Sequence, residues 1–589
     1  YRSADGTCTN LESPYVGAAG TAFGRNVRPD LIDHDAEDKL MTPPPGEVSK
    51  TFFTRDTFKE VPFLNMIAAS WIQFMNHDWL THGKNAEKNP MKVARSNGQD
   101  SIVERTKDSN VKSSDIKGEF GKVTINDVTH WWDGSQLYGS SLEEQKKVRS
   151  FNKGKMLTVK VNGRELLPKD SSLDVARNKQ NQGYEVTGFR DNWWVGLSML
   201  HHLFVKEHNA IAEMLYKEYV KYDSKTKTYF WDQNGFLGKG KNLFIKKENE
   251  KGVHQFKTEA ELDEHIFQVA RLINAAVMSK IHTVEWTPAI LPNPGLILAM
   301  CANWYGTVNP NCWSKHLKNV PGLGATDILG SVVELDYIAG GIVGQEMKDF
   351  GYPYSITEEF TSVYRLHSLL PEKLNFKRLS DKDKVAAVDF VETRNEKSYG
   401  FMENYDLKDL FFSFGTQKPG QLVLNNFPKF MQELPIPGLG VMDLGMMDII
   451  RDRERGVPRY NQFRRGIGLK PIRKYTDFFP GGVAGDEKQK AILKKFETLY
   501  GKDDDGNDNV EMIDLLVGTL AEEVRPTYFG FGETQFQIFI LMASRRLMTD
   551  RFYTENYTPE YYTKAGLDWI DKKGILASVI SRHMPELAP

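Results

Sequence analysis

The chain alternates long stretches of apolar residues at helical spacing with polar, glycine-rich connections. In the helical stretches, apolar side chains recur three to four residues apart, which places them on one face of an α-helix. Strand signals are short and scattered. The predicted fold class is therefore mainly α, with few short strands. Helices are expected at residues 63–80, 142–150, 192–221, 259–281, 357–370, 383–392, 406–415, 425–433, 443–455, 487–500, 510–521, 533–550 and 558–571.

Less regular segments connect these helices. Residues 1–60 are rich in Gly, Pro and Asp and are expected to form an irregular N-terminal arm. Residues 84–122 and 222–258 are polar or Lys- and Gly-rich, which predicts loops or a solvated hairpin. No repeat of solenoid period is present in the sequence, so residues 1–589 are expected to form a single large domain. Because the sequence begins at Tyr1 rather than Met, we expect the natural N-terminus to be missing.

Composition narrows the class of protein. Hydrophobic residues make up 40% and charged residues 26% of the chain, as in soluble globular proteins, and a net charge of -2 gives no basic excess for nucleic acid. No apolar run in the sequence reaches the length of a membrane-spanning helix. Peripheral contact with a membrane or lipid body remains open. The 3 cysteines are too few for a disulfide framework and favour a reducing, intracellular compartment.

The stretch WIQFMNHDWLTH, residues 71–82, contains the first candidate site. Gln73 and His77 are four residues apart, so on a helix their side chains share one face. Asp78 follows at about 100° around the helix axis and points elsewhere. Taken alone, such a pair more often satisfies its own hydrogen bonds than binds a ligand.

The stretch NDVTHWWDGSQLYGSS, residues 126–141, gathers oxygen atoms. Thr129, Asp133 and Ser135 offer side-chain oxygens, and the carbonyl of Trp131 can join them. Oxygens of this kind, completed by a carboxylate from elsewhere, suit a hard cation such as Ca²⁺. A metal-free Asp-Gly turn is the simpler interpretation of this stretch on its own.

Other stretches carry candidate residues, each of which could by itself be part of a satisfied polar core. Together with the Gln/His helix they supply what a haem pocket requires: a histidine to ligate iron, another on the opposite face, and an arginine for a propionate. The candidates are Tyr364 and His367 in SVYRLHSLLP, Asp448 and Arg451 in MMDIIRDRERG, Arg190 before the predicted helix at 192–221, and His282 and Thr287 in SKIHTVEWTPAIL.

The order and spacing of these motifs resemble the haem peroxidase–cyclooxygenase superfamily over nearly the whole chain, and most of all its fatty-acid α-dioxygenases. QFMNHDW is similar to the distal helix of the family, which implies that His77 is the distal histidine and Gln73 its companion. YRLH resembles the proximal stretch, which makes His367 the iron ligand. The implied fold is the helical catalytic domain of animal haem peroxidases. The resemblance also implies that Asp448 in DIIR is the partner of the proximal histidine and that Arg451 and Arg190 contact the haem.

The same resemblance assigns the cofactors. THWWDGS is similar to the calcium loop of the family. Mammalian peroxidases bond haem covalently through carboxylates, but the matching positions here are Asn76 and Trp193, and neither can form an ester. The resemblance therefore implies non-covalent haem b and calcium. The implied calcium ligands are Asp78, Thr129, the Trp131 carbonyl, Asp133 and Ser135.

Departures from the peroxidases favour the α-dioxygenases. Tyr364 is similar to the radical tyrosine of cyclooxygenases and α-dioxygenases. The implied reaction is abstraction of the α-hydrogen of a fatty acid, followed by addition of O₂. The product is a 2-hydroperoxy fatty acid, which can decarboxylate to a shorter aldehyde. In that family a His, a Thr and an Arg hold the substrate carboxylate, and the matching residues are His282, Thr287 and either Arg546, which we favour, or Arg545.

Two alternative functions fit the same sequence. A hydrogen-peroxide-consuming peroxidase would use His77 and His367 without needing Tyr364. An inactive scaffold on the same fold would need neither histidine. The expected partners of the enzyme are a fatty acid and O₂, with a monomeric chain and no nucleic acid.

Overall fold

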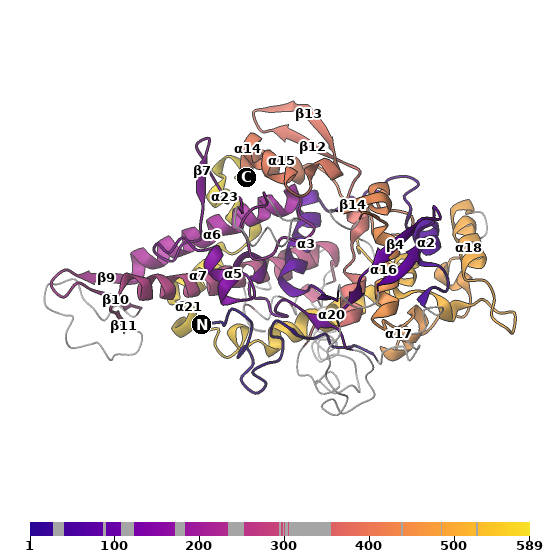
Figure 1. Cartoon of the computed structure of the whole chain (residues 1–589), viewed down its shortest axis with the longest axis horizontal. Coiled ribbons are helices and arrows are strands. Elements are labelled where there is room, and N and C mark those ends of the chain that lie inside the picture. Colours follow the sequence, from indigo (N-terminus) through magenta and orange to yellow (C-terminus); the bar gives the residue numbers. More distant parts are fainter. Residues whose placement is uncertain are drawn as a thin grey trace, which may run out of the picture.

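The molecule is elongated, with a small sheet at one end and a helix at the other (Figure 1). The sheet contains β9 (Val220–Asp223), β10 (Thr228–Asp232) and β11 (Val253–Phe256), and the helix is α18 (Glu487–Leu499). Helices make up 47% of the structure and strands 15%, which confirms the mainly α prediction. The structure is a computed structural model that describes residues 1–27, 40–85, 90–107, 123–170, 183–233, 253–293, 296–297, 300, 304, 355–436, 440–483, 486–525 and 528–588.

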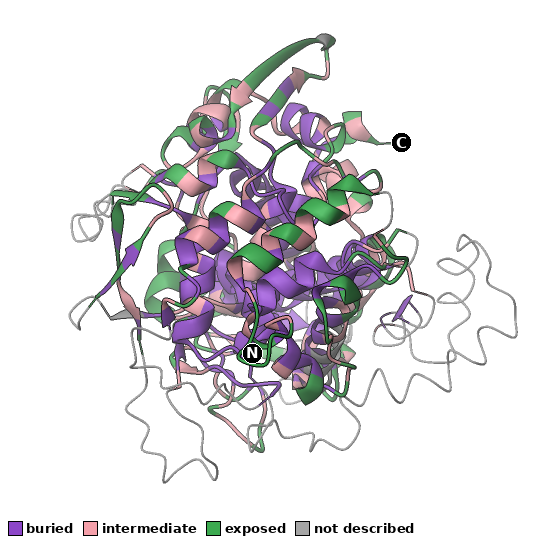
Figure 2. Ribbon diagram, turned by 90° about the vertical axis from the view of Figure 1, so that its right-hand side faces the viewer, coloured by how far each residue is buried: buried purple, intermediate pink, exposed green. Residues whose placement is uncertain are grey.

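Three long helices, all in the positions that the sequence predicts, form the first half of the core. They are α3 (Met66–Trp79), α6 (Val195–Tyr219) and α7 (Glu259–Ile281). The side chain of Asn65 caps the start of α3, and a capping box at Thr258 starts α7. Helix α6 packs against both of the others. Figure 2 shows buried residues concentrated in the middle of the molecule.

A second group of helices comes from the C-terminal half of the chain. Helix α13 (Glu358–Val363) packs against α16 (Leu444–Glu454), α19 (Leu515–Ala521) and α20 (Glu533–Thr549). One continuous cluster of buried apolar side chains includes residues of both groups. The site described below lies where α3 of the first group meets α13 and α16 of the second.

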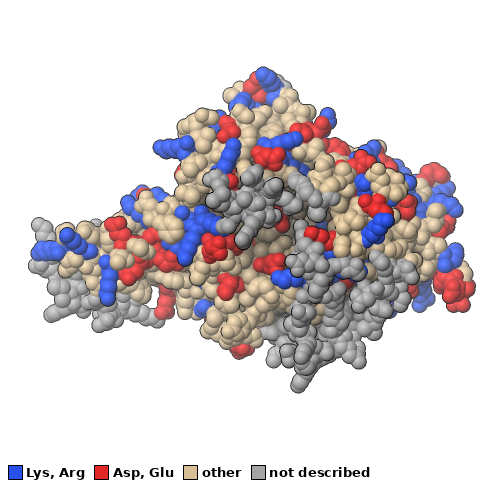
Figure 3. Space-filling model, in the orientation of Figure 1, with Lys and Arg blue, Asp and Glu red and all other residues tan. Residues whose placement is uncertain are grey.

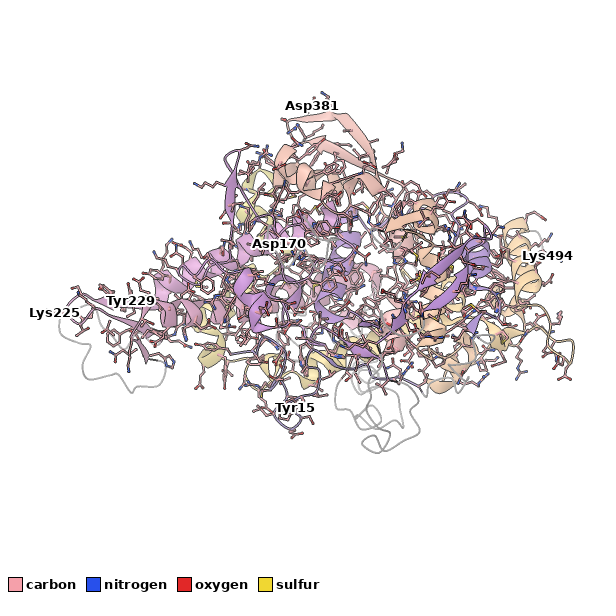
Figure 4. All side chains as sticks on the ribbon, viewed as in Figure 1. Tyr15, Asp170, Lys225, Tyr229, Asp381 and Lys494 are labelled. Atoms are coloured by element: carbon pink, nitrogen blue, oxygen red, sulfur yellow. The ribbon has the colours of Figure 1, made fainter. Side chains whose placement is uncertain are left out.

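The predicted helix at 383–392 is wrong. The segment forms strand β13 (Asp381–Asp389), which pairs antiparallel with β12 (Lys373–Arg378). Leu374 and Phe376 of β12 alternate with exposed neighbours and are buried, so this strand has a strong sheet pattern of its own. Pairing with β12 decides the conformation of β13, whose local sequence favours a helix. Figure 4 labels Asp381 at the tip of this hairpin.

The predicted helix at 357–370 is also wrong beyond its first half. Helix α13 ends at Val363, Tyr364 has φ -85° and ψ 8°, and a 3₁₀ turn begins at His367. The residues at the end of α13 have low helix propensity, and the hydroxyl of Ser362 donates a hydrogen bond to Asp452 of α16 at 2.6 Å. Tyr364 and His367 therefore do not share a helix face.

Shorter elements complete the chain. Within the described residues no helix is long and apolar enough to cross a membrane. On the face in Figure 3, basic and acidic side chains of the described residues are interspersed. The shorter helices are α2 (Pro45–Val48), α4 (Ser135–Tyr138), α5 (Leu142–Lys147), α8 (Thr287–Ile290), α14 (Lys397–Asn404), α15 (Leu407–Gly415), α17 (Tyr460–Gly466), α21 (Pro559–Tyr562), α22 (Lys564–Lys573) and α23 (Leu576–His583). The other strand pairs are β1 (Thr21–Ala22) with β6 (Ile125–Asn126), β2 (Lys84–Asn85) with β5 (Arg105–Thr106), β3 (Met91–Ala94) with β4 (Asp100–Val103), β7 (Val159–Val161) with β8 (Arg164–Leu166), and β14 (Leu434–Ile436) with β15 (Gly440–Met442).

Candidate active site

A cavity of about 410 Å³ lies between α3, the turn after α13, and α16. Helix α3 contributes the side chains of Gln73 and His77, as their spacing predicts. Tyr364 and His367 line the same cavity from the turn after α13. The two predicted haem histidines and the predicted radical tyrosine therefore meet in one cavity, although no single helix carries Tyr364 and His367. Asp448 and Arg451 of α16 complete this part of the wall.

One ring nitrogen of His367 lies close to a carboxylate. Its Nδ1 lies 3.0 Å from Oδ2 of Asp448, the predicted partner. The Asp448 carboxylate also contacts Arg365, with 3.4 Å between Nε and Oδ1. The His367 side chain is 27% exposed and lines the cavity. Nδ1 is buried beside Asp448, which leaves Nε2 as the nitrogen that can ligate a metal.

His77 lies on the α3 wall of the cavity and is neutral. Burial, with a smaller contribution from His201, lowers the pKa of His77 to about 3. Its Nδ1 is buried and has no hydrogen-bond partner among the described residues. Its companion Gln73 accepts a hydrogen bond from the indole N–H of Trp194 at 2.8 Å. A neutral imidazole with an unsatisfied nitrogen can bind a ligand or accept a proton.

Tyr364 is almost fully buried among aromatic rings. Its ring is stacked on Phe360 at 4.1 Å and meets Trp79 edge-on at 6.1 Å. Burial raises the pKa of Tyr364 well above its usual value, so the phenol stays protonated at neutral pH. Its backbone carbonyl accepts a hydrogen bond from the side chain of Asn76 at 3.4 Å, which ties this turn to α3.

His282 lies in a π-helical turn (His282–Trp286) that follows α7. Its Nδ1 accepts a hydrogen bond from the indole N–H of Trp71 at 3.2 Å. Burial and, to a smaller extent, Arg546 lower the pKa of His282 well below its usual value. Thr287, at the start of α8, is buried, and its hydroxyl has no partner among the described residues. Both side chains can therefore bind a ligand.

Arg546 is buried in α20 against two tryptophans. Its guanidinium carbon lies 4.3 Å from the ring centre of Trp79 and 5.0 Å from that of Trp132. The same two rings meet the edge of His282 at 5.2 and 5.0 Å. Trp79 thus contacts Arg546, His282 and Tyr364, so two of the predicted carboxylate-binding residues adjoin the predicted radical residue. The alternative Arg545 has a side chain outside the described part of the structure.

The predicted calcium ligands also come together. The backbone N–H of Ser135 donates to the Asp78 carboxylate at 2.6 Å and to that of Asp133 at 3.1 Å. The Thr129 hydroxyl donates to Asp133 at 2.9 Å. Burial and the nearby Asp133 raise the pKa of Asp78 well above its usual value. A cation would offset this repulsion, and Arg271 does so in part, 3.2 Å from Asp133.

The predicted calcium ligands include hydroxyl and carbonyl oxygens besides carboxylates. In the described part of the chain, no group of three or more His, Cys, Asp or Glu side chains could hold a metal ion. A calcium site here would therefore need the hydroxyls of Thr129 and Ser135 and the carbonyl of Trp131 besides the two carboxylates. Trp131 is itself buried.

The arginines that line the cavity are not all those that the sequence predicts. Arg190 is not among the residues that line the cavity, because its guanidinium pairs with Asp170. Arg455 and Arg394 do line it. Arg455 follows Arg451 by four residues, so the helical spacing could have indicated it. Arg394 ends a 3₁₀ turn that the sequence does not predict.

Comparisons with known proteins agree with this arrangement. The animal haem peroxidase family matches residues 1–588. The chain is 34% identical to the α-dioxygenase PIOX of Nicotiana tabacum and 32% identical to α-dioxygenase 2 of Arabidopsis thaliana. Those alignments cover 100% of this chain and 80% and 82% of the relatives.

Solved structures give the same result. The crystal structure of the Oryza sativa fatty acid α-dioxygenase has a TM-score of 0.75 at 31% identity and covers 100% of this chain and 84% of that one. A Tyr-to-Phe variant of the rice enzyme with palmitic acid matches with the same TM-score and identity, over 100% of this chain and 85% of that one. The chain therefore belongs to the animal haem peroxidase family and, within it, to the fatty-acid α-dioxygenases.

Proposed function

We propose that the chain is a haem-dependent fatty-acid α-dioxygenase in which Tyr364 is the hydrogen-abstracting residue. The observation that supports this most strongly is the position of Tyr364. It lines the cavity that contains His367 and His77, and through Trp79 it adjoins His282 and Arg546. A peroxidase needs the cavity with the two histidines, but it does not need a carboxylate-binding site beside the tyrosine.

The residues of the cavity fit haem, the cofactor of the family. His367 presents Nε2 for iron, and His77 faces the same cavity from α3. Arg451, Arg455 and Arg394 provide cations for the propionates. The haem is held without ester bonds, because neither Asn76 nor Trp193 carries a carboxylate. Bound haem supplies the one-electron oxidant.

The substrate carboxylate binds to Arg546, His282 and Thr287. Arg546 provides the charge, and the other two side chains provide hydrogen bonds that the buried carboxylate requires. The apolar surroundings of these residues strengthen the electrostatic attraction. A carboxylate held beside Trp79 brings the α-carbon, rather than a distant carbon, to Tyr364.

Tyr364 acts after loss of one electron and one proton. The phenoxyl oxygen takes a hydrogen atom from the α-carbon, so the phenol re-forms and a carbon radical remains. O₂ adds to that radical, and the resulting peroxyl takes a hydrogen atom back from Tyr364. The product is the 2-hydroperoxy fatty acid, which can lose carbon dioxide and water to give a shorter aldehyde. Burial of Tyr364 keeps water from the radical.

The chain further binds calcium at Asp78, Thr129, Trp131, Asp133 and Ser135. The support is the proximity of two buried carboxylates and two hydroxyls, with Arg271 paired directly to Asp133 alone of the two carboxylates among the described residues. A monomeric state and peripheral contact with a membrane or lipid body remain predictions.

The test is oxygen consumption with palmitate and no added peroxide. The native protein should consume O₂ and form the 2-hydroperoxy acid or the shorter aldehyde. Tyr364→Phe should lower this activity by at least about a hundredfold while native haem absorption and hydrogen-peroxide-dependent oxidation of a phenol persist. Oxygen consumption that survives in Tyr364→Phe would exclude the proposed role. Phenol oxidation alone, in both proteins, would identify a peroxidase instead.

A further inference from the structure

Trp71 contacts the proposed substrate-binding histidine without lining the cavity. It lies on α3, is 1% exposed, and packs against Phe74 and Phe204. Its indole N–H donates to Nδ1 of His282 at 3.2 Å. An indole nitrogen can only donate, so the direction of this hydrogen bond is fixed by chemistry.

The direction of the bond selects a tautomer of His282. A neutral imidazole carries one hydrogen, and the nitrogen that accepts a bond cannot carry it. Nδ1 accepts from Trp71, so the hydrogen is on Nε2. The opposite tautomer would place two N–H groups against each other in a buried site, and both would lose their hydrogen bond.

The neighbours of His282 fix the orientation of its ring. Trp286 is stacked on it at 4.8 Å with 16° between the planes, and the edges of Trp79 and Trp132 contact it from α3 and the 131–132 segment. The charged group that acts on His282 among the described residues is Arg546 of α20, which also opposes protonation. The ring thus has a single orientation and a single donor.

We propose that Trp71 is a positioning residue for the substrate: its indole N–H holds His282 as the Nε2–H tautomer, the form that donates to a fatty-acid carboxylate. This inference rests on the proposed function. It also sets the charge of the site, because Arg546 contributes one positive charge and His282 contributes none. Such a site matches a monoanionic carboxylate.

The test replaces only the N–H group. Benzothienylalanine at position 71 keeps the shape of the indole and substitutes sulfur for N–H, and Trp71→Phe serves as a second variant. We expect KM for palmitate to rise about fivefold with kcat within about twofold of native, because one hydrogen bond to the bound carboxylate is weakened. Trp569→Phe is the matched control, since it removes a buried indole donor whose acceptor, Glu207, neither lines the cavity nor contacts His282.

The pH profile tests whether the effect is one of tautomer rather than of charge. In all of these proteins KM should keep the same pH dependence between about pH 6.5 and 9, because burial and Arg546 keep His282 neutral with or without the Trp71 donor. In the position-71 variants Nδ1 is free to carry the hydrogen of the neutral ring, so KM should be higher than in the native protein and in Trp569→Phe at every pH in this range. Equal, level KM values in all of these proteins would overturn the proposal.

A double-mutant cycle completes the test. In a His282→Ala background, the change at position 71 should no longer raise KM, because its effect passes through His282. An effect that persists there would also overturn the proposal. Failure of the proposed function is distinguishable, since it would appear as a native protein that neither binds palmitate nor consumes O₂ with it.

Discussion

At the scale of single residues, the chemistry depends on which nitrogen of each histidine is engaged. Asp448 lies at Nδ1 of His367, and Trp71 donates to Nδ1 of His282. One partner is an acceptor and the other a donor, so the two imidazoles have opposite characters at Nε2. His367 presents a lone pair to a metal, whereas His282 presents a hydrogen to a carboxylate.

Asp448→Asn should weaken haem binding by roughly tenfold or more, because an amide is a poorer hydrogen-bond acceptor for the ligating imidazole than a carboxylate. The measurement is the rate of haem transfer to a haem-free acceptor protein. Asp452→Asn, one turn further along α16, is the control, because Asp452 bonds to Ser362 and Arg365 rather than to His367. Equal haem loss from the two variants would show that Asp448 acts only through the packing of α16.

The sequence was sufficient to find the histidines and, by resemblance, Asp448 beside His367, but not the Trp71 partner of His282. Gln73 and His77 follow from helical spacing, because both lie on one helix. The neighbours of His282 come from α3, α20 and the 131–132 segment, and only tertiary packing brings them together. The pairing of Arg190 with Asp170 is likewise not visible in the local pattern.

At the scale of elements, helix α3 contributes side chains to three sites, each from a different face of the helix. Gln73 and His77 face the cavity, Trp71 and Trp79 face His282, and Asp78 faces the predicted calcium loop. The position of α3 against its neighbour α6 therefore affects all three sites. The packing is tight near the start of α6, where a Cβ on Gly196 would lie 2.3 Å from Trp194 and 2.5 Å from the hydroxyl of Ser70 in α3.

Gly196→Ala should destabilise the protein by roughly 1–3 kcal/mol, although alanine is the better helix former, because the added methyl group forces these side chains apart. Gly400→Ala is the matched control: it lies within α14, nothing surrounds its added Cβ within 4 Å, and it should stabilise by roughly 0.5–1 kcal/mol. Calorimetry should therefore give melting temperatures that move in opposite directions. A shift of the haem absorption band is expected only for Gly196→Ala.

The long helices were predictable because burial and local preference agree. Helices α3 and α7 combine an apolar face with a side-chain cap, and α6 is a long helix whose residues are mostly buried. Prediction failed where a long-range partner decides the conformation. The segment of β13 is a strand because it pairs with β12, and α13 ends before Tyr364 rather than continuing through it.

At the scale of the whole molecule, the start of the chain is tied to its C-terminal part by a buried ion pair. The guanidinium of Arg2 pairs with Asp550 at 2.7 Å, and both side chains are buried. Arg271 of α7 donates to the carbonyls of Arg2 and Ser3, and also to Asp133 of the calcium loop. The N-terminal arm was predicted to be irregular, but its first residues are part of the core.

Arg2→Ala should therefore destabilise the protein by roughly 3–5 kcal/mol, because it leaves the Asp550 carboxylate buried without its cation. Burial already raises the pKa of Asp550, and loss of Arg2 removes the main opposing influence, so the pKa rises further. The folded variant then retains a proton that the unfolded chain releases, and its stability must fall as the pH rises. The loss in melting temperature relative to native should be larger at pH 8 than at pH 5.

The double variant Arg2→Ala with Asp550→Asn is the control, because it removes the buried charge altogether. Its loss in melting temperature relative to native should be independent of pH. An equal pH dependence in the single and double variants would show that Asp550 is not the responsible group.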